Sequence, residues 1–280
     1  MVELDDYFTN GKPNDPVTQG LGWPYQIMAY LEEATAQQNA AAFAGAGPGA
    51  AQRALQEHAI PLYNCPSRRG PTRPNGSWLI CYAGANGGPT RTEDPDHFED
   101  YLHDADDGYS NHQNVLYWGC LLCTPGPPAS VLGSLAPELM PVFRGIIQRS
   151  GSVNGIVYPW VRTVKMAQVT DGTSNTLILG EKRLQPSKYE TGAWYDDRGW
   201  AGGWDPDIVR STIYPLKRDA EDSDRWVTGV LPFSFGGAHS GGMNGLFADG
   251  SVRIINYDID REHFNRLGHR SDGELIDLDE

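Results

Sequence analysis

The residue with the most direct capacity for chemistry is His239, which lies in the glycine-rich run of residues 233–255. Its imidazole could ligate a metal or transfer a proton near neutral pH. It could equally hold the backbone of a neighbouring turn, because the glycines beside it let the chain approach the ring closely. No second histidine or cysteine stands at the spacing of a metal site, and a lone histidine holds metal poorly. The sequence therefore favours a structural role and leaves the other two open.

Two segments carry an Asp-Gly pair followed by hydroxyl or amide residues, which is the chemistry of a capped turn. The second pair predicts a β-hairpin over residues 246–255, because Asp-Gly tolerates the positive φ of a tight turn. We expect both carboxylates to bond to their own backbone; the alternative is that the two turns converge around a shared ion or ligand. The residues concerned are Asp171, Gly172, Ser174 and Asn175 in the first turn and Asp249 and Gly250 in the second.

An acidic segment is the local candidate for calcium, the one cofactor that the sequence suggests. Asp104, Asp106 and Asp107 precede a glycine, so carboxylates stand near a bend as in a calcium loop. An EF-hand would also need a glutamate at its twelfth position, which is Val115 here. The segment is therefore not an EF-hand, and further carboxylates would have to come from elsewhere. The alternative is a solvated acidic loop.

The region before the predicted hairpin is dense in aromatic residues interleaved with aspartates. Such residues hold sugar rings, although aromatic side chains more often anchor a loop on a core. A glycan-binding face is thus one hypothesis, and its residues would be Trp194, Tyr195, Trp200 and Trp204.

No motif indicates catalysis. A Gly-x-Ser-x-Gly nucleophile elbow is absent from the sequence. Ser234, His239 and Asp249 are present, but their spacing does not place them as a triad. We therefore expect a protein that is not an enzyme.

Composition limits the partners and the architecture. The 280 residues carry a net charge of −14, which argues against nucleic acid, since binding phosphates needs a basic face. A hydrophobic content of 39% suits a globular protein. The 33 glycines and 20 prolines predict many turns and long ordered loops.

The elements that would position these residues mix helices and strands. Apolar spacing predicts a helix over residues 23–39, a short one over 51–58, and another over 260–267 with Asp258 or Asp260 as its N-cap. Strand-like runs occupy residues 78–83, 164–169 and 176–180, and another begins at residue 155. We predict an irregular arm over 1–20 and a single head over 21–280, with long loop insertions at 91–142 and 190–228.

Five blocks in a fixed order resemble a known family. They are GWPYQIMAYLEE at 22–33, CPS at 65–67, TDGTSNT with LILGE at 170–181, the His-x(nine)-Asp-Gly motif from His239, and LGHRSDGELI at 267–276. Together they resemble the bacterial domain-of-unknown-function family 1559, a prepilin-type family of pilin-like surface proteins. The resemblance implies an α+β fold: a pilin-like globular head with a small antiparallel sheet, a packed N-terminal helix and long ordered loops.

The resemblance also implies a function in assembly or adhesion at the cell surface or after secretion. The expected partners are like subunits or a cell-surface glycan; the alternative function is a soluble glycan-binding module, assisted by calcium. Members begin with a prepilin leader and a long apolar helix, whereas this chain begins with an acidic, turn-rich stretch. No run approaches the roughly 20 apolar residues of a membrane span, and no signal peptide is evident. We expect the full-length form to carry the prepilin helix; a soluble descendant is the alternative.

The four cysteines suggest disulfides if the protein is exported, as the resemblance implies. The bridge we expect first joins Cys65 to Cys81, and a second would join Cys120 to Cys123. Buried thiols are the alternative, and a zinc site lacks a second closely spaced pair.

Overall fold

The computed structural model describes residues 21–43, 50–93, 95–96, 98–99, 102, 144–148, 163–201, 205–221 and 233–274. It also gives the backbone of four short strands, β1 (Phe8–Thr9), β2 (Lys12–Pro13), β4 (Ser152–Val153) and β5 (Ile156–Val157). β1 pairs antiparallel with β2, and β4 with β5.

The chain divides into two compact units, each built from three segments. The N-terminal unit comprises Met1–Cys81, Gln148–Val164 and Lys188–Ile208; the sheet unit comprises Tyr82–Ile147, Lys165–Ser187 and Val209–Glu280. The single head predicted over residues 21–280 stays a prediction, as does the packing of the N-terminal helix on the sheet.

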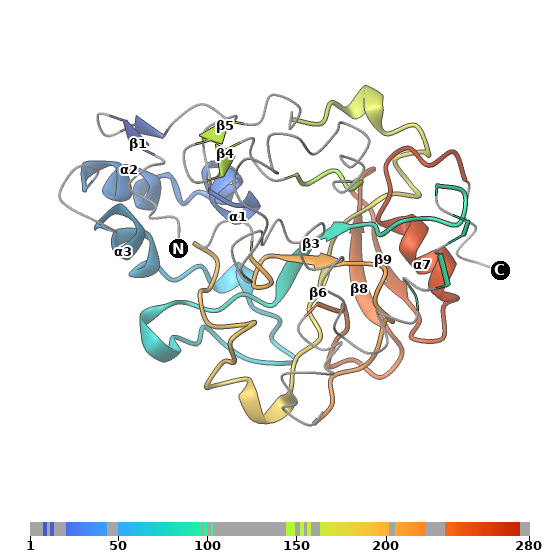
Figure 1. Ribbon diagram of the computed structural model, residues 1–280. Helices are drawn as coiled ribbons and strands as arrows, with labels where there is room; N and C mark the ends of the chain where they lie inside the picture. Colours follow the sequence, from blue (N-terminus) through green and yellow to red (C-terminus); the bar gives the residue numbers. More distant parts are fainter. Residues whose placement is uncertain are drawn as a thin grey trace. The chain divides into compact units, whose positions relative to one another are not determined.

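A five-stranded sheet forms the centre of the sheet unit (Figure 1). Its order is β7 (Val209–Ser211), β3 (Tyr82–Asn86), β6 (Leu177–Glu181), β8 (Met243–Phe247) and β9 (Val252–Ile255). All neighbours are antiparallel except β3 and β7, which are parallel. A mostly antiparallel sheet together with helices confirms the predicted α+β class.

The predicted hairpin is formed by β8 and β9. Gly250 has a φ of +85°, and its amide donates to the carbonyl of Phe247 at 3.0 Å. The carboxylate of Asp249 accepts from the amide and the hydroxyl of Ser251, at 2.8 and 2.6 Å. The Asp-Gly pair therefore closes its own tight turn, as expected.

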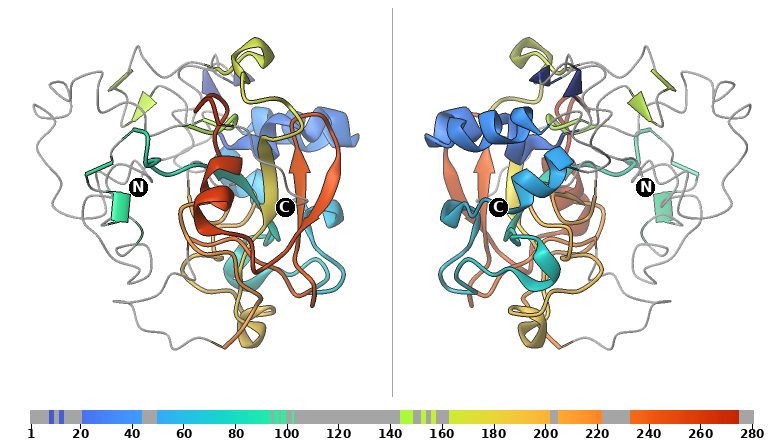
Figure 2. Two further views of the ribbon diagram at one scale, coloured as in Figure 1. Left: turned by 90° about the vertical axis from the view of Figure 1, so that its right-hand side faces the viewer. Right: turned by 90° about the vertical axis from the view of Figure 1, so that its left-hand side faces the viewer.

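Helix α7 (Arg261–Leu267) lies beside the sheet, as Figure 2 shows, and completes its core. The Asp260 carboxylate accepts from the amide of His263 at 3.0 Å, which confirms Asp260 as the N-cap. Phe264 packs edge-on against Phe235 with ring centroids 6.1 Å apart. The buried core comprises Ala83, Ala85, Leu177, Leu216, Phe235, Met243, Phe247, Ile255, Phe264 and Leu267.

The N-terminal unit contains short helices in place of the long one expected over residues 23–39. They are α1 (Trp23–Gln26), the 3₁₀ helix η2 (Met28–Leu31), α2 (Ala34–Ala42) and α3 (Ala50–Gln56). The predicted helix breaks at Glu32, which has a left-handed φ of +64°. Two contacts fold α2 back: Gln37 Nε2 donates to the carbonyl of Tyr25, and Glu33 pairs with His58. None of the helices in the described ranges has the length and apolar character that crossing a bilayer requires.

The described residues also contain four single 3₁₀ turns, namely η3 (Pro61–Tyr63), η4 (Pro74–Gly76), η6 (Met166–Gln168) and η7 (Pro186–Lys188). The strand predicted over residues 164–169 is therefore wrong, because η6 occupies it. The side chain of Gln168 accepts from the amide of Lys165 at 2.8 Å and closes this turn.

The predicted Cys65–Cys81 bridge is also wrong. Both cysteines are buried, and no disulfide joins them. The amide of Cys81 donates to the carbonyl of Tyr63 at 2.8 Å. The carbonyl of Cys65 instead accepts from the amides of Arg68 and Arg69, so the chain turns away at that point.

Candidate functional site

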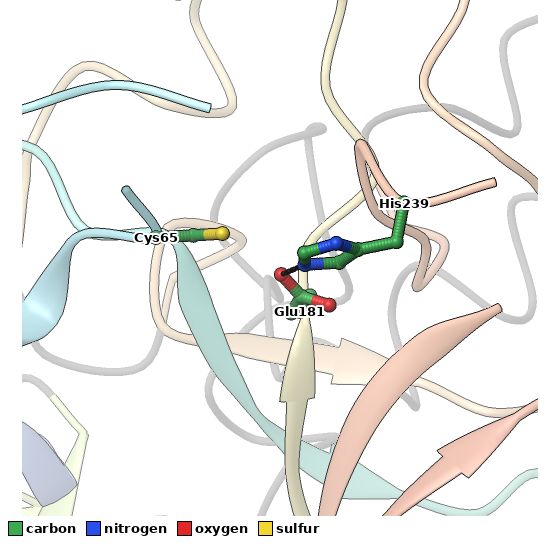
Figure 3. A group of neighbouring side chains, drawn as sticks. All are labelled: Cys65, Glu181 and His239. Atoms are coloured by element: carbon green, nitrogen blue, oxygen red, sulfur yellow. Dashed lines mark ion pairs between the residues drawn. The ribbon is translucent and has the colours of Figure 1, made fainter. Parts of the chain in front are cut away.

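Two charged or titratable side chains from different family blocks meet in the sheet unit. Glu181 ends β6, and its side chain is only 1% exposed. His239 lies in the loop before β8 with its side chain 35% exposed. Its Nε2 is 3.3 Å from Oε1 of Glu181, as the dashed line in Figure 3 marks. Figure 3 also labels Cys65, which belongs to the N-terminal unit.

Strand pairing positions the Glu181 carboxylate. Gly180 of β6 is paired with Gly245 of β8, so Glu181 lies beside Asn244. Its Oε2 accepts from the amide and from the Nδ2 of Asn244, at 2.8 and 3.2 Å. No described residue donates a hydrogen bond to Oε1, although this atom is buried. The carboxylate is thus held by one oxygen and directs the other at His239.

The backbone of His239 is held by Tyr257, which follows β9. The Tyr257 hydroxyl lies 2.9 Å from the carbonyl of His239 and 3.0 Å from that of Gly237. A Cβ at Gly237 would stand 3.1 Å from Glu181 Oε2, closer than most side chains tolerate. Glycine therefore lets this loop lie directly on the carboxylate.

This arrangement supplies one nitrogen and one oxygen ligand for a cation, or a carboxylate–imidazole pair for proton transfer. Sequence reasoning found His239 but missed Glu181, Asn244 and Tyr257 as its surroundings. A signal was available, because Glu181 ends the block that follows TDGTSNT and Asn244 lies between His239 and Asp249.

The two Asp-Gly turns lie side by side, but their carboxylates do not converge. The amides of Ala248 and Asp249 donate to the carbonyls of Thr176 and Thr173, at 2.9 and 3.0 Å. The Arg253 guanidinium donates to the carbonyl of Ser174. Within the first turn, Gly172 has a φ of +95°, and Asn175 Nδ2 donates to the carbonyl of Asp171 at 3.2 Å.

The prediction that the Asp171 carboxylate bonds to its own turn is wrong, because this carboxylate binds the C-terminal segment. It accepts from the amides of Asp272 and Gly273, at 2.6 and 2.9 Å. The TDGTSNT block therefore fastens the C-terminal LGHRSDGE segment through backbone bonds, which is a structural use of the first turn.

A buried histidine and aspartate lie in that same segment. His269 Nε2 is 2.7 Å from the carbonyl of Gly88, and its Nδ1 is 3.9 Å from Asp272 Oδ2. Burial, aided by the positive charge of Arg144, lowers the pKa of His269 to about 3. Burial, together with the negative charge of Asp171, raises the pKa of Asp272 to about 6. The imidazole of His269 and the carboxyl group of Asp272 are therefore both uncharged inside the fold at mildly acidic pH.

The aromatic residues of the N-terminal unit do not form one exposed face. Trp194 is 43% exposed, but Tyr195 and Trp200 are buried. Trp200 donates from Nε1 to the carbonyl of His58 at 3.1 Å and lies 6.0 Å from the ring of Tyr63. The buried rings of Tyr195 and Trp200 anchor their loop. Of the three predicted aromatic residues that the structure describes, Trp194 is the exposed one.

Several predicted residues lie outside the described part of the chain. They are the calcium candidates Asp104, Asp106 and Asp107, the cysteines Cys120 and Cys123, and Trp204.

Comparisons with known proteins show which family the chain belongs to. No curated protein and no solved structure matched the chain. A family model described as "Protein of unknown function (DUF1559)" matches residues 5–262, which include the Glu181 and His239 site and all five strands of the central sheet. The chain therefore belongs to the DUF1559 family.

Proposed function

We propose that this chain is a non-enzymatic, pilin-like surface or secreted protein that acts by assembling with like subunits. The observation that carries the proposal is the exposed apolar edge of the central sheet. β9 is the last strand in the sheet order, and its side chains Val252 and Ile254 are 66% and 67% exposed.

The pattern of β9 makes this edge suitable for pairing. Val252 and Ile254 lie on one face, while Ile255 is buried in the core. Arg253 places its guanidinium 3.6 Å from the centroid of the Phe247 ring, so it covers the hairpin. An edge strand with exposed β-branched residues is a template for a further strand.

A second copy of the chain is the occupant that fits this edge. Antiparallel pairing of two identical strands is self-complementary, and it sets apolar side chains of one copy against those of the other. At the opposite edge of the described sheet, all three residues of β7 are buried. Because β9 is the last strand of the described sheet and the residues of β7 are buried, pairing through β9 closes as a two-fold dimer.

The test is the mass of the protein in solution against concentration, by sedimentation velocity. We expect a dimer for the natural chain and a monomer for Val252→Lys and Ile254→Lys, because a charge would lie in the pairing face. Met166→Lys is the matched control, since Met166 is exposed in the same unit but lies outside the sheet. A natural chain that remains monomeric at every concentration would overturn assembly through β9.

The location is tested separately. In intact cells that express the full-length chain, a membrane-impermeant amine label should modify the protein. If the protein is secreted, it should instead be recovered from the medium. Labelling only after lysis would contradict the surface or secreted location.

A further inference from the structure

We propose that Glu181 and His239 ligate a divalent transition-metal ion, for which zinc is the best-suited candidate. The inference goes beyond the proposed assembly and does not depend on it.

The distance between the two ligand atoms is the first argument. Oε1 of Glu181 and Nε2 of His239 are 3.3 Å apart. A charge-assisted hydrogen bond between such groups is shorter, at about 2.7–2.9 Å. Zinc holds nitrogen and oxygen ligands at about 2.0–2.2 Å in a tetrahedron, whose edge is then about 3.3–3.5 Å. The observed separation of 3.3 Å lies within the range of this tetrahedron edge.

The hydrogen bonding of Oε1 is the second argument. The Glu181 side chain is almost fully buried, and no described residue donates a hydrogen bond to Oε1. A buried carboxylate oxygen without a donor is costly, and a bound cation removes that cost. The half-exposed His239 gives an ion a path from solvent.

The surroundings of the pair resemble the outer shell of a metal site. Asn244 donates twice to Oε2, which orients the carboxylate and leaves Oε1 for the ion. Tyr257 fixes the backbone that carries the imidazole. Such partners fix ligand direction and contribute strongly to metal affinity.

The ligand types select the class of ion. Imidazole nitrogen with one carboxylate suits zinc and its transition-metal neighbours, whereas calcium and magnesium prefer oxygen ligands alone. Two protein ligands leave coordination positions of the ion for water or for a further donor. Such a site can exchange these additional ligands.

The experiment is a zinc titration of tag-free, chelator-stripped protein by competition with a chromophoric chelator. We expect one zinc ion per chain, with affinity falling about a hundredfold in Glu181→Gln and in His239→Ala. Glu181→Gln keeps the shape of the side chain and an oxygen that can accept from Asn244. His263→Ala is the matched control, because His263 is exposed on α7, and it should bind zinc as the natural chain does.

A thermal melt of the natural chain keeps the proposal testable if either variant fails to fold. Zinc should raise the melting temperature of the natural chain, and a chelator should reverse the rise. Absence of zinc binding by the natural chain, or equal binding by Glu181→Gln, His239→Ala and the control, would overturn the proposal.

Discussion

At the scale of single residues, Arg69 stabilises the N-terminal unit through a two-point ion pair. Its two terminal nitrogens lie 2.6 and 2.9 Å from the carboxylate oxygens of Asp196, and both side chains are buried. The same nitrogens donate to the carbonyls of Ile80 and Tyr189. This residue follows the CPS block and joins two of the three segments of the unit, Met1–Cys81 and Lys188–Ile208.

We predict that Asp196→Asn or Arg69→Met lowers the free energy of unfolding by about 3–5 kcal/mol, because each leaves one buried charge without its counterion. Urea unfolding measures the loss. The double variant Arg69→Met with Asp196→Leu should recover part of it. Arg73→Met, in the more exposed pair with Glu57, should cost less than about 1 kcal/mol. A loss as small in Asp196→Asn as in Arg73→Met would contradict the assigned role.

His269 and Asp272 predict two opposed dependences of stability on pH. The pKa of His269 lies below its ordinary value, so its contribution is present above pH 6.5 and is lost as the pH falls toward about 3. The pKa of Asp272 lies above its ordinary value of 3.8, so its contribution is present below that pH and is lost as the pH rises toward about 6. In the natural chain the two slopes oppose each other between these values.

Substitution separates the slopes, each of up to about 1.4 kcal/mol per pH unit for one proton. In His269→Gln, stability should fall as the pH rises from about 4 to 6; in Asp272→Asn, it should fall as the pH drops below about 6.5. Urea unfolding between pH 4 and 7 measures both. Slopes of the same sign in the two variants would show that one assignment is wrong.

At the scale of elements, the hairpin turn tests backbone strain without a steric clash. A Cβ at Gly250 would meet no atom within 4 Å, so its φ of +85° is the cause of any cost. We predict that Gly250→Val lowers stability by about 1–3 kcal/mol. A Cβ at Gly241 also meets nothing, and this residue lacks a positive φ, so Gly241→Val is the matched control. Equal melting temperatures for both variants would show that the turn is not strained.

The elements that could be predicted from sequence are those with local signals. Asp249-Gly250 marks the hairpin and Asp260 marks the start of α7, because turn and capping chemistry act over a few residues. The helix break at Glu32 could not be predicted, because no glycine or proline stands at that position. The break accompanies contacts of Glu33 and Gln37 with residues outside their own helix.

Strand β7 was hidden inside the loop predicted over residues 190–228. It has three residues, too few for a period, and its central residue is a fully buried arginine. Arg210 is satisfied by the carbonyls of Arg183 and Ser234, at 3.1 and 2.9 Å. For the candidate site likewise, His239 was visible as a motif residue, but Glu181 becomes its neighbour only through the pairing of β6 with β8.

At the scale of the whole molecule, the net charge of −14 favours cations near the surface. The calcium site at Asp104, Asp106 and Asp107 stays a prediction. We expect calcium to raise the melting temperature more than sodium chloride of equal ionic strength, and a calcium-selective chelator to reverse it. At a hundredfold excess over the dissociation constant, the gain would be about 2.7 kcal/mol. The double variant Asp104→Asn with Asp106→Asn should show the same melting temperature in calcium chloride as in sodium chloride. If the natural chain also melts at the same temperature in the two salts, the segment is a solvated acidic loop and not a calcium site.

The strand order also sets when the sheet unit can fold. β3 pairs with β6 and with β7, both far away in the sequence, and β8 and β9 complete the core near the C-terminal end. Such non-local pairing must close long loops before any core is buried, which places folding in the millisecond-to-second range. A growing chain on the ribosome therefore holds β3 without its neighbours until most of the protein has been made. Until then the hydrogen-bonding groups along both edges of β3 lack the strands that pair with them in the folded sheet.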